Sequence, residues 1–238
     1  MTLKLLSLKK ITGYIQVESG LHIGASKESI EIGGVDNPII KNPKVIYLDT
    51  KGKQEAKLLL EPYIPGSSLK GKMRSMLEWK FNEFDGEGNV KKEPDKNSFI
   101  ARIFGHPNKK LGVGPTRLVI RDSFLEAQQS KELNSKGIEL TEIKYENSIN
   151  RITALAVPRP VERAISGLKF DLEIIYKIFD FEGDGGKTDK DNYQYVKQAL
   201  KLVELDSLGG GGSRGSGKVK FYLQDDEGNI DLEKVELK

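Results

Sequence analysis

Residues 168–181 read LKFDLEIIYKIFDF, a stretch in which apolar side chains return at every second position. A period of two is typical of a β-strand with one buried face. The apolar positions are Leu168, Phe170, Leu172, Ile174, Tyr176 and Ile178. The stretch therefore predicts a long strand that lines a hydrophobic core, and the segments on either side of it decide the fold.

Those other segments show either the same period or a helical one. We expect strands at 8–18, 117–124 and 219–223, and helices with an apolar face at 65–81 and 192–205. With the strand at 168–181, the chain order is strand, helix, strand, strand, helix, strand. This βαββαβ order predicts an α+β fold of the ferredoxin-like, RRM-like type.

Longer insertions interrupt this order. Residues 20–40 are rich in turns and predict a long, ordered loop, and residues 43–62 predict a short hairpin. Residues 138–166 combine alternation with prolines and many charges, which favours a protruding hairpin. Arg159 and Arg163 belong to it, and we interpret them either as solvated side chains or as contacts to a ligand.

The helix at 65–81 begins with PGSSLKGKMR. We expect Ser67 or Ser68 to cap it, because serine favours the N-terminus of a helix. The amides and the positive dipole end at this position favour an anion. Lys70, Lys72 and Arg74 add positive charge in the first turns. Lys70 and Arg74 lie one turn apart, so they predict contacts with adjacent phosphates of a nucleic acid. An ordinary solvated basic face is the other interpretation.

The carboxylate of most interest is Asp36, in the sequence GGVDNP. Two glycines before it and a proline after Asn37 restrict the backbone to a loop that can present a side chain to a ligand. Asp36 could act as a general base or hold a divalent ion, or it could only stabilise a turn. His22 is a loop hydrogen-bonding residue, an RNA contact or a general acid.

A glycine run, LGGGGSRGSGKVKF, covers residues 208–221. It contains GxxxxGK, as does GSSLKGK at 66–72, but the next residues are Val219 and Met73. A phosphate-binding loop for nucleotides needs a serine or threonine there, so we expect no nucleotide. We expect a loop before the last strand that lets an RNA backbone approach, with Gly211, Ser213 and Arg214 as contacts. The alternative is a merely flexible turn.

Composition excludes several classes of protein. The chain has 238 residues, 37% of them hydrophobic, with no cysteine, two histidines and a net charge of +3. The absence of cysteine excludes disulfides, cysteine nucleophiles and zinc ribbons, so we expect no zinc. No apolar stretch approaches ~20 residues and the first residues lack the pattern of a signal peptide. We therefore expect a cytoplasmic protein that is not bound to a membrane.

Four stretches, taken in order, resemble one known family. They are GLHIGASKESIEIGGVDNPII at 20–40, IPGSSLKGKMRSMLE at 64–78, KYENSINRITALAVPRPVERA at 144–164 and LDSLGGGGSRGSGKV at 205–219. They resemble the crRNA-binding backbone subunits of type III-A CRISPR effectors, the Csm complex, within the RAMP superfamily. Ala25 in place of glycine, a longer stretch at 41–62 and the lack of zinc-binding cysteines are departures from the family.

The resemblance implies a single RAMP domain over 1–238. Its palm would comprise about 8–84, 116–124 and 168–223, with lid insertions at about 19–62 and 85–115 and a thumb hairpin at about 138–166. Copies of the family's subunits stack head to tail on the guide RNA beside other Csm subunits, and each thumb kinks the duplex of guide and target.

The resemblance also implies an activity. The family cuts target RNA at regular intervals with Mg²⁺ or another divalent cation, and its catalytic aspartate corresponds to Asp36. Its guide-binding residues correspond to the start of the helix at 65–81 and to the glycine run. Two rival hypotheses are a non-catalytic RNA-binding scaffold and a metal-independent nuclease that processes the guide, for which His22 would be the candidate residue.

Overall fold

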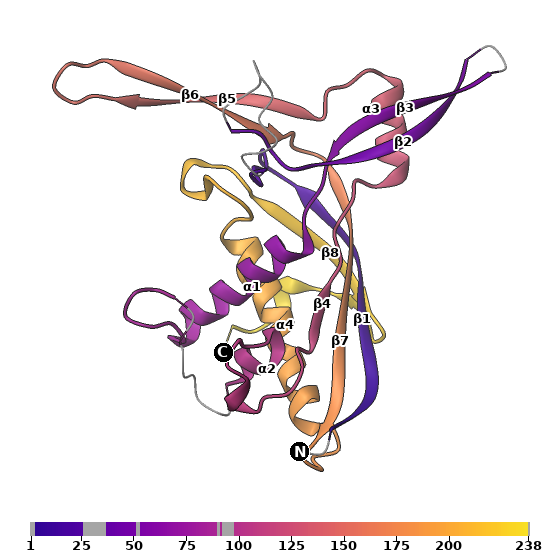
Figure 1. Ribbon diagram of the computed structural model, residues 1–238, viewed down its shortest axis with the longest axis vertical. Helices are drawn as coiled ribbons and strands as arrows, with labels where there is room; N and C mark the ends of the chain where they lie inside the picture. The colour runs from indigo at the N-terminus through magenta and orange to yellow at the C-terminus, as the bar shows by residue number, and fades with distance from the viewer. Residues whose placement is uncertain (1–2, 26–36, 51–52, 90, 92–97, 238) are drawn as a thin grey trace.

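The computed structural model describes residues 3–25, 37–50, 53–89, 91 and 98–237. An elongated body of sheet and helices carries two hairpins that project from one end, while the first described residues lie at the opposite end (Figure 1). Residues that the sequence places far apart, in the hairpins and in the glycine run, therefore gather at the same end of the molecule.

The body is built on a five-stranded antiparallel sheet with the order β4-β7-β1-β8-β9. Its strands are β1 (Leu3–Val17), β4 (Leu118–Ile120), β7 (Lys169–Phe181), β8 (Val219–Asp225) and β9 (Gly228–Ile230). The first four are the expected strands, and the chain order β1, α1, β4, β7, α4, β8 confirms the predicted βαββαβ fold.

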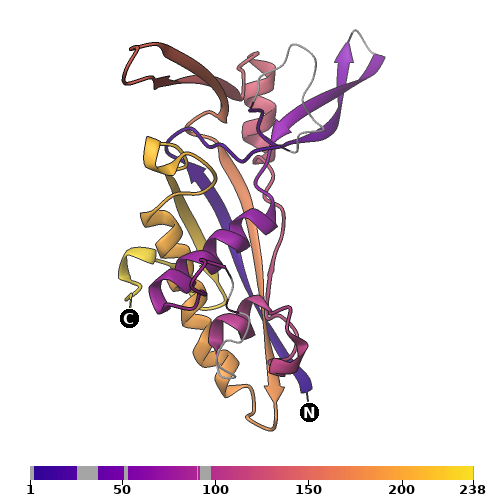
Figure 2. The ribbon, with the colours of Figure 1, turned by 60° about the vertical axis from the view of Figure 1, so that its left-hand side comes forward.

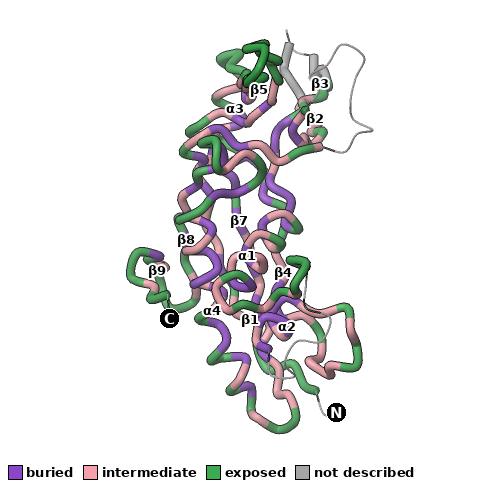
Figure 3. Tube along the Cα trace, turned by 90° about the vertical axis from the view of Figure 1, so that its left-hand side faces the viewer, coloured by how far each residue is buried: buried purple, intermediate pink, exposed green. Residues whose placement is uncertain are grey.

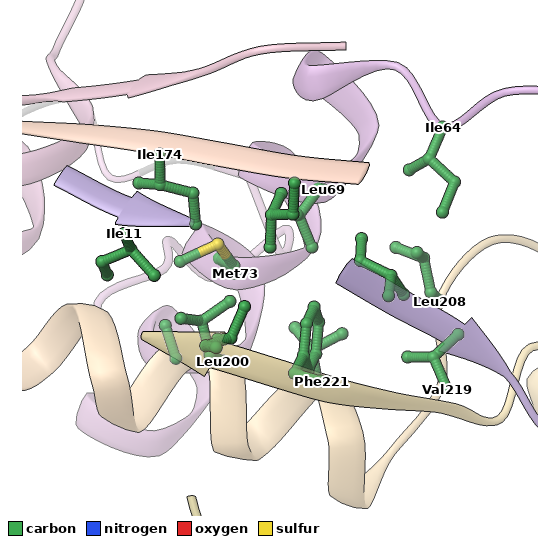
Figure 4. Close-up of a cluster of buried hydrophobic side chains, with 14 of the residues drawn as sticks. Ile11, Ile64, Leu69, Met73, Ile174, Leu200, Leu208, Val219 and Phe221 are labelled. Atoms are coloured by element: carbon green, nitrogen blue, oxygen red, sulfur yellow. The ribbon is translucent and has the colours of Figure 1, made fainter. Parts of the chain in front are cut away.

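Helices α1 (Gly66–Phe81) and α4 (Lys187–Leu205) cover one face of this sheet. Between the sheet and the helices, Ile11, Ile174, Leu69, Met73 and Leu200 meet in the core (Figure 4). Shorter helices are α2 (Phe99–Phe104) and α3 (Ala127–Ser135), and single 3₁₀ turns are η2 (Lys109–Leu111), η3 (Gly212–Arg214) and η4 (Leu232–Lys234). None of the helices in the described ranges has the length and apolarity that crossing a bilayer demands.

Strand β1 lies at the centre of the sheet, between β7 and β8. Its residues Ile11, Ile15 and Val17 are fully buried, as the alternation predicted. Position 13 requires glycine for a steric reason, because a Cβ there would lie 1.9 Å from the carbonyl oxygen of Tyr222 on β8. Glycine at the position that breaks the apolar alternation therefore lets the two backbones pack without a clash.

The projecting hairpins are β2–β3, formed by Lys41–Thr50 and Lys53–Pro62, and β5–β6, formed by Thr141–Ile149 and Ala156–Ala164. They leave the body in different directions, as a turn of the view makes clear (Figure 2). Most of β5–β6 is exposed, whereas the centre of the body is buried (Figure 3). These two hairpins occupy the segments where the sequence predicted hairpins.

Three local expectations were wrong. Neither Ser67 nor Ser68 caps α1, because its N-cap is Pro65 and the Gly66 amide donates to Asp122 Oδ1 at 2.8 Å. Helix α4 begins at Lys187 instead of 192, after a turn in which the Asp184 carboxylate accepts the amides of neighbouring residues.

The third error concerns the strand expected over 117–124, which is regular only over Leu118–Ile120. Residue Arg117 is fully buried, and its guanidinium donates to both carboxylate oxygens of Asp189 on α4, at 3.0 and 3.1 Å. Arg102 of α2 forms a second ion pair with Asp189, 3.0 Å from Nε to Oδ1. One buried carboxylate thus pairs with two guanidinium groups and joins α2, α4 and the edge of the sheet.

We predict that Asp189→Asn lowers the free energy of unfolding by about 3–5 kcal/mol, because it leaves buried positive charge without a partner. Urea denaturation measures the change. Asp191→Asn, an exposed position on the same helix, is the matched control and should stay within about 0.5 kcal/mol of the parent protein. Equal effects of the two substitutions would contradict the assignment.

Candidate nucleic-acid interface

The segment that follows β1 connects the parts of the chain singled out by the sequence. We call residues 18–25 the junction segment and residues 209–217 the glycine loop. The Glu18 amide donates to Lys218 O at 2.8 Å, Gly217 N donates to Gly20 O at 3.0 Å, and Gly210 N donates to His22 O at 2.8 Å. The junction segment thus holds the glycine loop along its length.

The same segment also holds the β5–β6 hairpin. Leu21 and Ala164 exchange both backbone hydrogen bonds, at 2.9 and 2.8 Å. His22 Nδ1 lies 2.7 Å from the carbonyl oxygen of Glu162 on β6. Since a carbonyl can only accept, this distance places the ring proton on Nδ1.

Further along, the junction segment pairs with residues 38–40. Ala25 N donates to Pro38 O at 3.0 Å, and Ile40 N donates to Ile23 O at 2.8 Å. These bonds close the base of the loop that the sequence predicted at 20–40. Asp36, the predicted catalytic residue and possible metal ligand, lies outside the described residues.

The described residue next to it, Asn37, is bound to the hairpin. Its carbonyl accepts the Glu162 amide at 3.2 Å, and its side-chain Nδ2 donates to Pro160 O at 3.4 Å. Within the described ranges, no three carboxylate or imidazole groups come together in a way that could hold a metal ion.

Glu162 is a residue whose role the sequence reasoning missed. It is 6% exposed, its Oε2 accepts the Ile39 amide at 3.0 Å, and its Oε1 pairs with Lys41 Nζ at 2.5 Å. Burial raises the pKa of a carboxyl, but the bonds from Lys41 and Ile39 outweigh it and hold the pKa of Glu162 below its usual value. One pattern in the sequence could have pointed to it. Side chains alternate between the two faces of a strand, which places Glu162 on the same face of the hairpin as Pro158 and Pro160.

The two faces of the β5–β6 hairpin differ in chemistry. One face alternates charged and small apolar side chains and includes Glu142, Lys144 and Glu146. The other face is mostly apolar, and its exposed members include Ile143 and Tyr145, which are 49% and 67% exposed. The charged face contacts the glycine loop.

That contact uses two of the arginines predicted to bind RNA. Arg163 pairs with Glu142 at 2.6 Å and donates to Ser216 Oγ at 3.2 Å. Arg214 pairs with Glu146 at 2.6 Å. Both guanidinium groups therefore already have carboxylate partners, so an RNA phosphate would have to compete with them.

Arg159 is different, because it is exposed and no ion pair involves it among the described residues. Lys144 Nζ also reaches the loop, where it donates to Arg214 O at 2.7 Å. Ser213 is exposed and lies in the 3₁₀ turn η3, directly after Gly211 and Gly212. Arg159 and Ser213 thus remain open to a ligand.

Several glycines of the loop are required by the protein itself. A Cβ at Gly209 would lie 2.3 Å from His22 O, at Gly212 2.1 Å from Ser207 Oγ and at Gly217 2.0 Å from Leu208 O. Gly211 has a φ of +74°, which side chains other than glycine rarely adopt. The loop is therefore tightly packed against the junction segment and against residues 207–208, and it is not a flexible spacer.

The basic residues of α1 point to different neighbours. Lys70 Nζ lies 3.4 Å from Thr116 Oγ1, and burial together with the charge of Arg74 lowers the pKa of Lys70. Arg74 pairs with Glu78 at 2.7 Å and donates to Gly105 O at 3.1 Å. The contact of adjacent phosphates by Lys70 and Arg74 stays a prediction, and both side chains already have partners within the protein.

Lys72 instead pairs with Asp206, which ends α4 just before the glycine loop. This ion pair brings the first turns of α1 close to the loop. Ser67 is exposed in the first turn and Ser68 is partly exposed, so both hydroxyl groups are accessible from this end of the body.

The comparisons with known proteins agree on one family. The family model of the RAMP superfamily matches residues 14–220. The chain is 42% identical over 214 residues to the CRISPR system Cms endoribonuclease Csm3 of Streptococcus thermophilus, covering 89% of this chain and 86% of that protein. It is 41% identical over 225 residues to the Csm3 of Methanothermobacter thermautotrophicus, covering 89% and 82%.

Among solved structures, the chain is similar to one in the crystal structure of the Csm3–Csm4 subcomplex of the type III-A CRISPR-Cas interference complex. The TM-score is 0.50 and the identity 26%, with 98% of this chain and 94% of that chain covered.

We predict that Gly212→Ala destabilises the fold by about 1–3 kcal/mol, because the new methyl group overlaps the Ser207 side chain. Thermal unfolding measures the loss. Adding Ser207→Gly removes the obstructing atoms, so the double variant should regain most of the stability of the parent protein. If the double variant stays as unstable as Gly212→Ala alone, contact with Ser207 is not the reason for the glycine.

Proposed function

The chain belongs to the RAMP superfamily and, within it, to the Csm3 endoribonucleases, and on this premise we propose that it binds guide RNA and cleaves the target RNA paired with that guide in a type III-A CRISPR complex. The observation that supports the proposal most strongly is the set of hydrogen bonds made by the junction segment. It brings the glycine loop, the β5–β6 hairpin and both ends of the segment containing Asp36 to one end of the body.

Guide binding would use backbone charge and shape. Arg159 and the polar groups at the start of α1 and in the glycine loop offer donors to phosphates without reading bases. Base pairing between guide and target would supply the sequence recognition, as it does in other RNA-guided effectors. The net charge of +3 is modest, so the proposal depends on where these donors lie and not on the total charge.

The β5–β6 hairpin would act as the thumb that kinks the duplex. The turn at its tip carries Ile152 and Leu155, which are 95% and 65% exposed, next to Ile149 at 63%. Apolar side chains that enter a base step unstack it and bend the duplex. An uncovered apolar tip on a projecting hairpin is suited to that role.

The chemistry we propose is transesterification within the target. The ribose 2′-oxygen attacks the adjacent phosphorus, the P–O5′ bond breaks, and the products are a 2′,3′-cyclic phosphate and a 5′-hydroxyl. Asp36 would accept the 2′-hydroxyl proton, or it would hold Mg²⁺ beside the hydroxyl while a water molecule takes that proton. The departing 5′-oxygen gains a proton from water. The kink contributes by bringing the attacking and leaving oxygens in line.

A divalent cation at Asp36 would neutralise charge that develops on the phosphate. Carboxylate and phosphate oxygens are the ligands that Mg²⁺ prefers. We propose no zinc and no nucleotide as cofactors.

In the assembly, we propose that copies of the chain stack head to tail along the guide and that other Csm subunits complete the complex. A partner like Csm4 fits, since the similar solved chain was crystallised in a Csm3–Csm4 subcomplex. The palm would then be the sheet body, the thumb β5–β6, and the lids the insertions at about 19–62 and 85–115. Regular stacking would produce cleavage at regular intervals.

We predict that Asp36→Ala abolishes target cleavage in the reconstituted complex and leaves assembly and target affinity within about twofold. Radiolabelled target RNA in Mg²⁺ measures cleavage, and filter binding measures affinity. Retention of cleavage by the variant would show that Asp36 is not the catalytic residue, and the chain would then act as an RNA-binding scaffold.

The proposed chemistry has its own control. A target with a single 2′-deoxyribose at the cleavage site should bind normally and remain uncut there, because the attacking oxygen is missing. Cleavage at the deoxy position would rule out the 2′-hydroxyl as the nucleophile.

We predict that changing Lys70, Lys72 and Arg74 together to Ala weakens guide RNA binding equally for all sequences and makes log Kd less dependent on log salt. The effect should be about one salt-slope unit or less, because Lys72 and Arg74 already have acidic partners. A salt titration measures it, with Lys136→Ala on α3 as the control. A sequence-selective loss would contradict the proposed backbone contacts.

A further inference from the structure

A single buried carboxylate joins the projecting hairpin to the chain that enters and leaves the junction. Glu162 lies on β6, and both its main chain and its side chain make contacts across to other segments. Its main chain binds His22 and Asn37, while its carboxylate binds Ile39 and Lys41. A residue in the hairpin thus contacts the chain on both sides of residues 26–36.

The contacts occupy both carboxylate oxygens. Oε2 accepts the Ile39 amide at 3.0 Å, and Oε1 pairs with Lys41 Nζ at 2.5 Å. The residue is 6% exposed. A carboxylate that is buried and saturated by protein donors is poorly placed to bind a metal ion or to accept a proton from a substrate.

Loss of the carboxylate would affect both partners. The Ile39 amide would have no acceptor in a buried position, and Lys41, whose side chain is 29% exposed, would lose its counter-charge. Leaving such groups unpaired is more costly than the contact itself is worth, so the segment would move to find other partners. Most of the hydrophobic core comes from the sheet and its covering helices, and Ile39 belongs to the same cluster.

We infer that Glu162 is a positioning residue of the cleavage reaction, which fixes residues 37–41 to the hairpin so that the hairpin and the adjoining chain keep one geometry when RNA binds. The inference rests on the proposed function, because it assumes that the residue before Asn37 is the one that acts on the target. Cleavage then depends on Glu162 although target binding does not. Small displacements of reacting groups, about 1 Å, can cost about 100-fold in rate.

The test uses the complex assembled with the full-length chain, guide RNA and labelled target RNA in Mg²⁺. The variants are Glu162→Ala, Glu162→Gln, Lys41→Met and the pair Glu162→Gln with Lys41→Met. The single-turnover rate constant at saturating target and the Kd for target are measured for each, at a temperature below the unfolding transition of every variant.

We expect Glu162→Ala to lower the rate constant about 100-fold and to leave the target Kd within about twofold. Glu162→Gln keeps an acceptor for the Ile39 amide and should lose less, about tenfold. Glu162 and Lys41 act through one ion pair, so the effects of the two substitutions should not add. The double variant should therefore cleave at most about threefold more slowly than the slower of the two single variants. Glu132→Gln, which removes the exposed pair with Lys136, is the control and should cleave at the parent rate.

A rate constant that stays within about twofold of the parent in both Glu162→Ala and Lys41→Met would overturn the inference. A loss of target affinity in proportion to the loss of rate would also overturn it, because that pattern indicates general damage to the fold. If Glu162→Ala does not assemble, Lys41→Met decides by the same criteria.

Asp36→Ala is measured alongside to separate the two proposals. If Asp36→Ala abolishes cleavage and the Glu162 variants cleave normally, only the positioning role fails. If Asp36→Ala cleaves normally, the proposed function fails whatever the Glu162 variants do.

Discussion

The positions of the glycine loop, the β5–β6 hairpin and residues 38–40 depend on the backbone hydrogen bonds that the junction segment makes after β1 leaves the sheet. Buried amides and carbonyls need partners, and those of residues 18–25 find theirs in three other parts of the chain. The glycine loop bonds to Gly20 and His22, the hairpin to Leu21, and residues 38–40 to Ile23 and Ala25. Strand β1 pairs with β7 on one side and with β8 on the other, so the junction segment starts from a strand whose position is fixed by the sheet.

Four basic side chains that we expect to contact RNA already form ion pairs within the protein. Arg163, Arg214, Lys72 and Arg74 each pair with a carboxylate, and the partners come from the hairpin, from the end of α4 and from α1 itself. Binding of a polyanion would therefore exchange one partner for another. Such an exchange lowers the net gain per contact, and it ties RNA binding to the position of the hairpin, since Glu142 and Glu146 both belong to β5.

Sequence patterns predicted the sheet body well, because alternation and helical periodicity reflect burial directly. Local boundaries were less predictable. Asp122 satisfies the Gly66 amide from a distant part of the chain, so the two serines of α1 had no role as caps. The burial of Arg117 follows from Asp189, 72 residues later, and a window of neighbouring residues contains no sign of it.

For the candidate site, the sequence patterns singled out the glycine loop, the hairpin and the start of α1, but they gave no sign of the acidic partners of the cations there. Ion pairs such as that of Arg214 with Glu146 join residues far apart in the chain. Glu162 was overlooked because a glutamate among prolines and arginines looks exposed, whereas its strand parity turns it toward residues 37–41.

The most direct test of the central claim is a structure of the assembled complex with guide RNA and a target that carries 2′-deoxyribose at the cleavage sites. We predict that the Asp36 carboxylate lies within hydrogen-bonding reach of the reacting ribose and phosphate, about 3 Å away or through one water or cation. We also predict that Glu162 still contacts Ile39 and Lys41. A scissile phosphate far from Asp36, at a site formed by other residues, would contradict the catalytic role of Asp36.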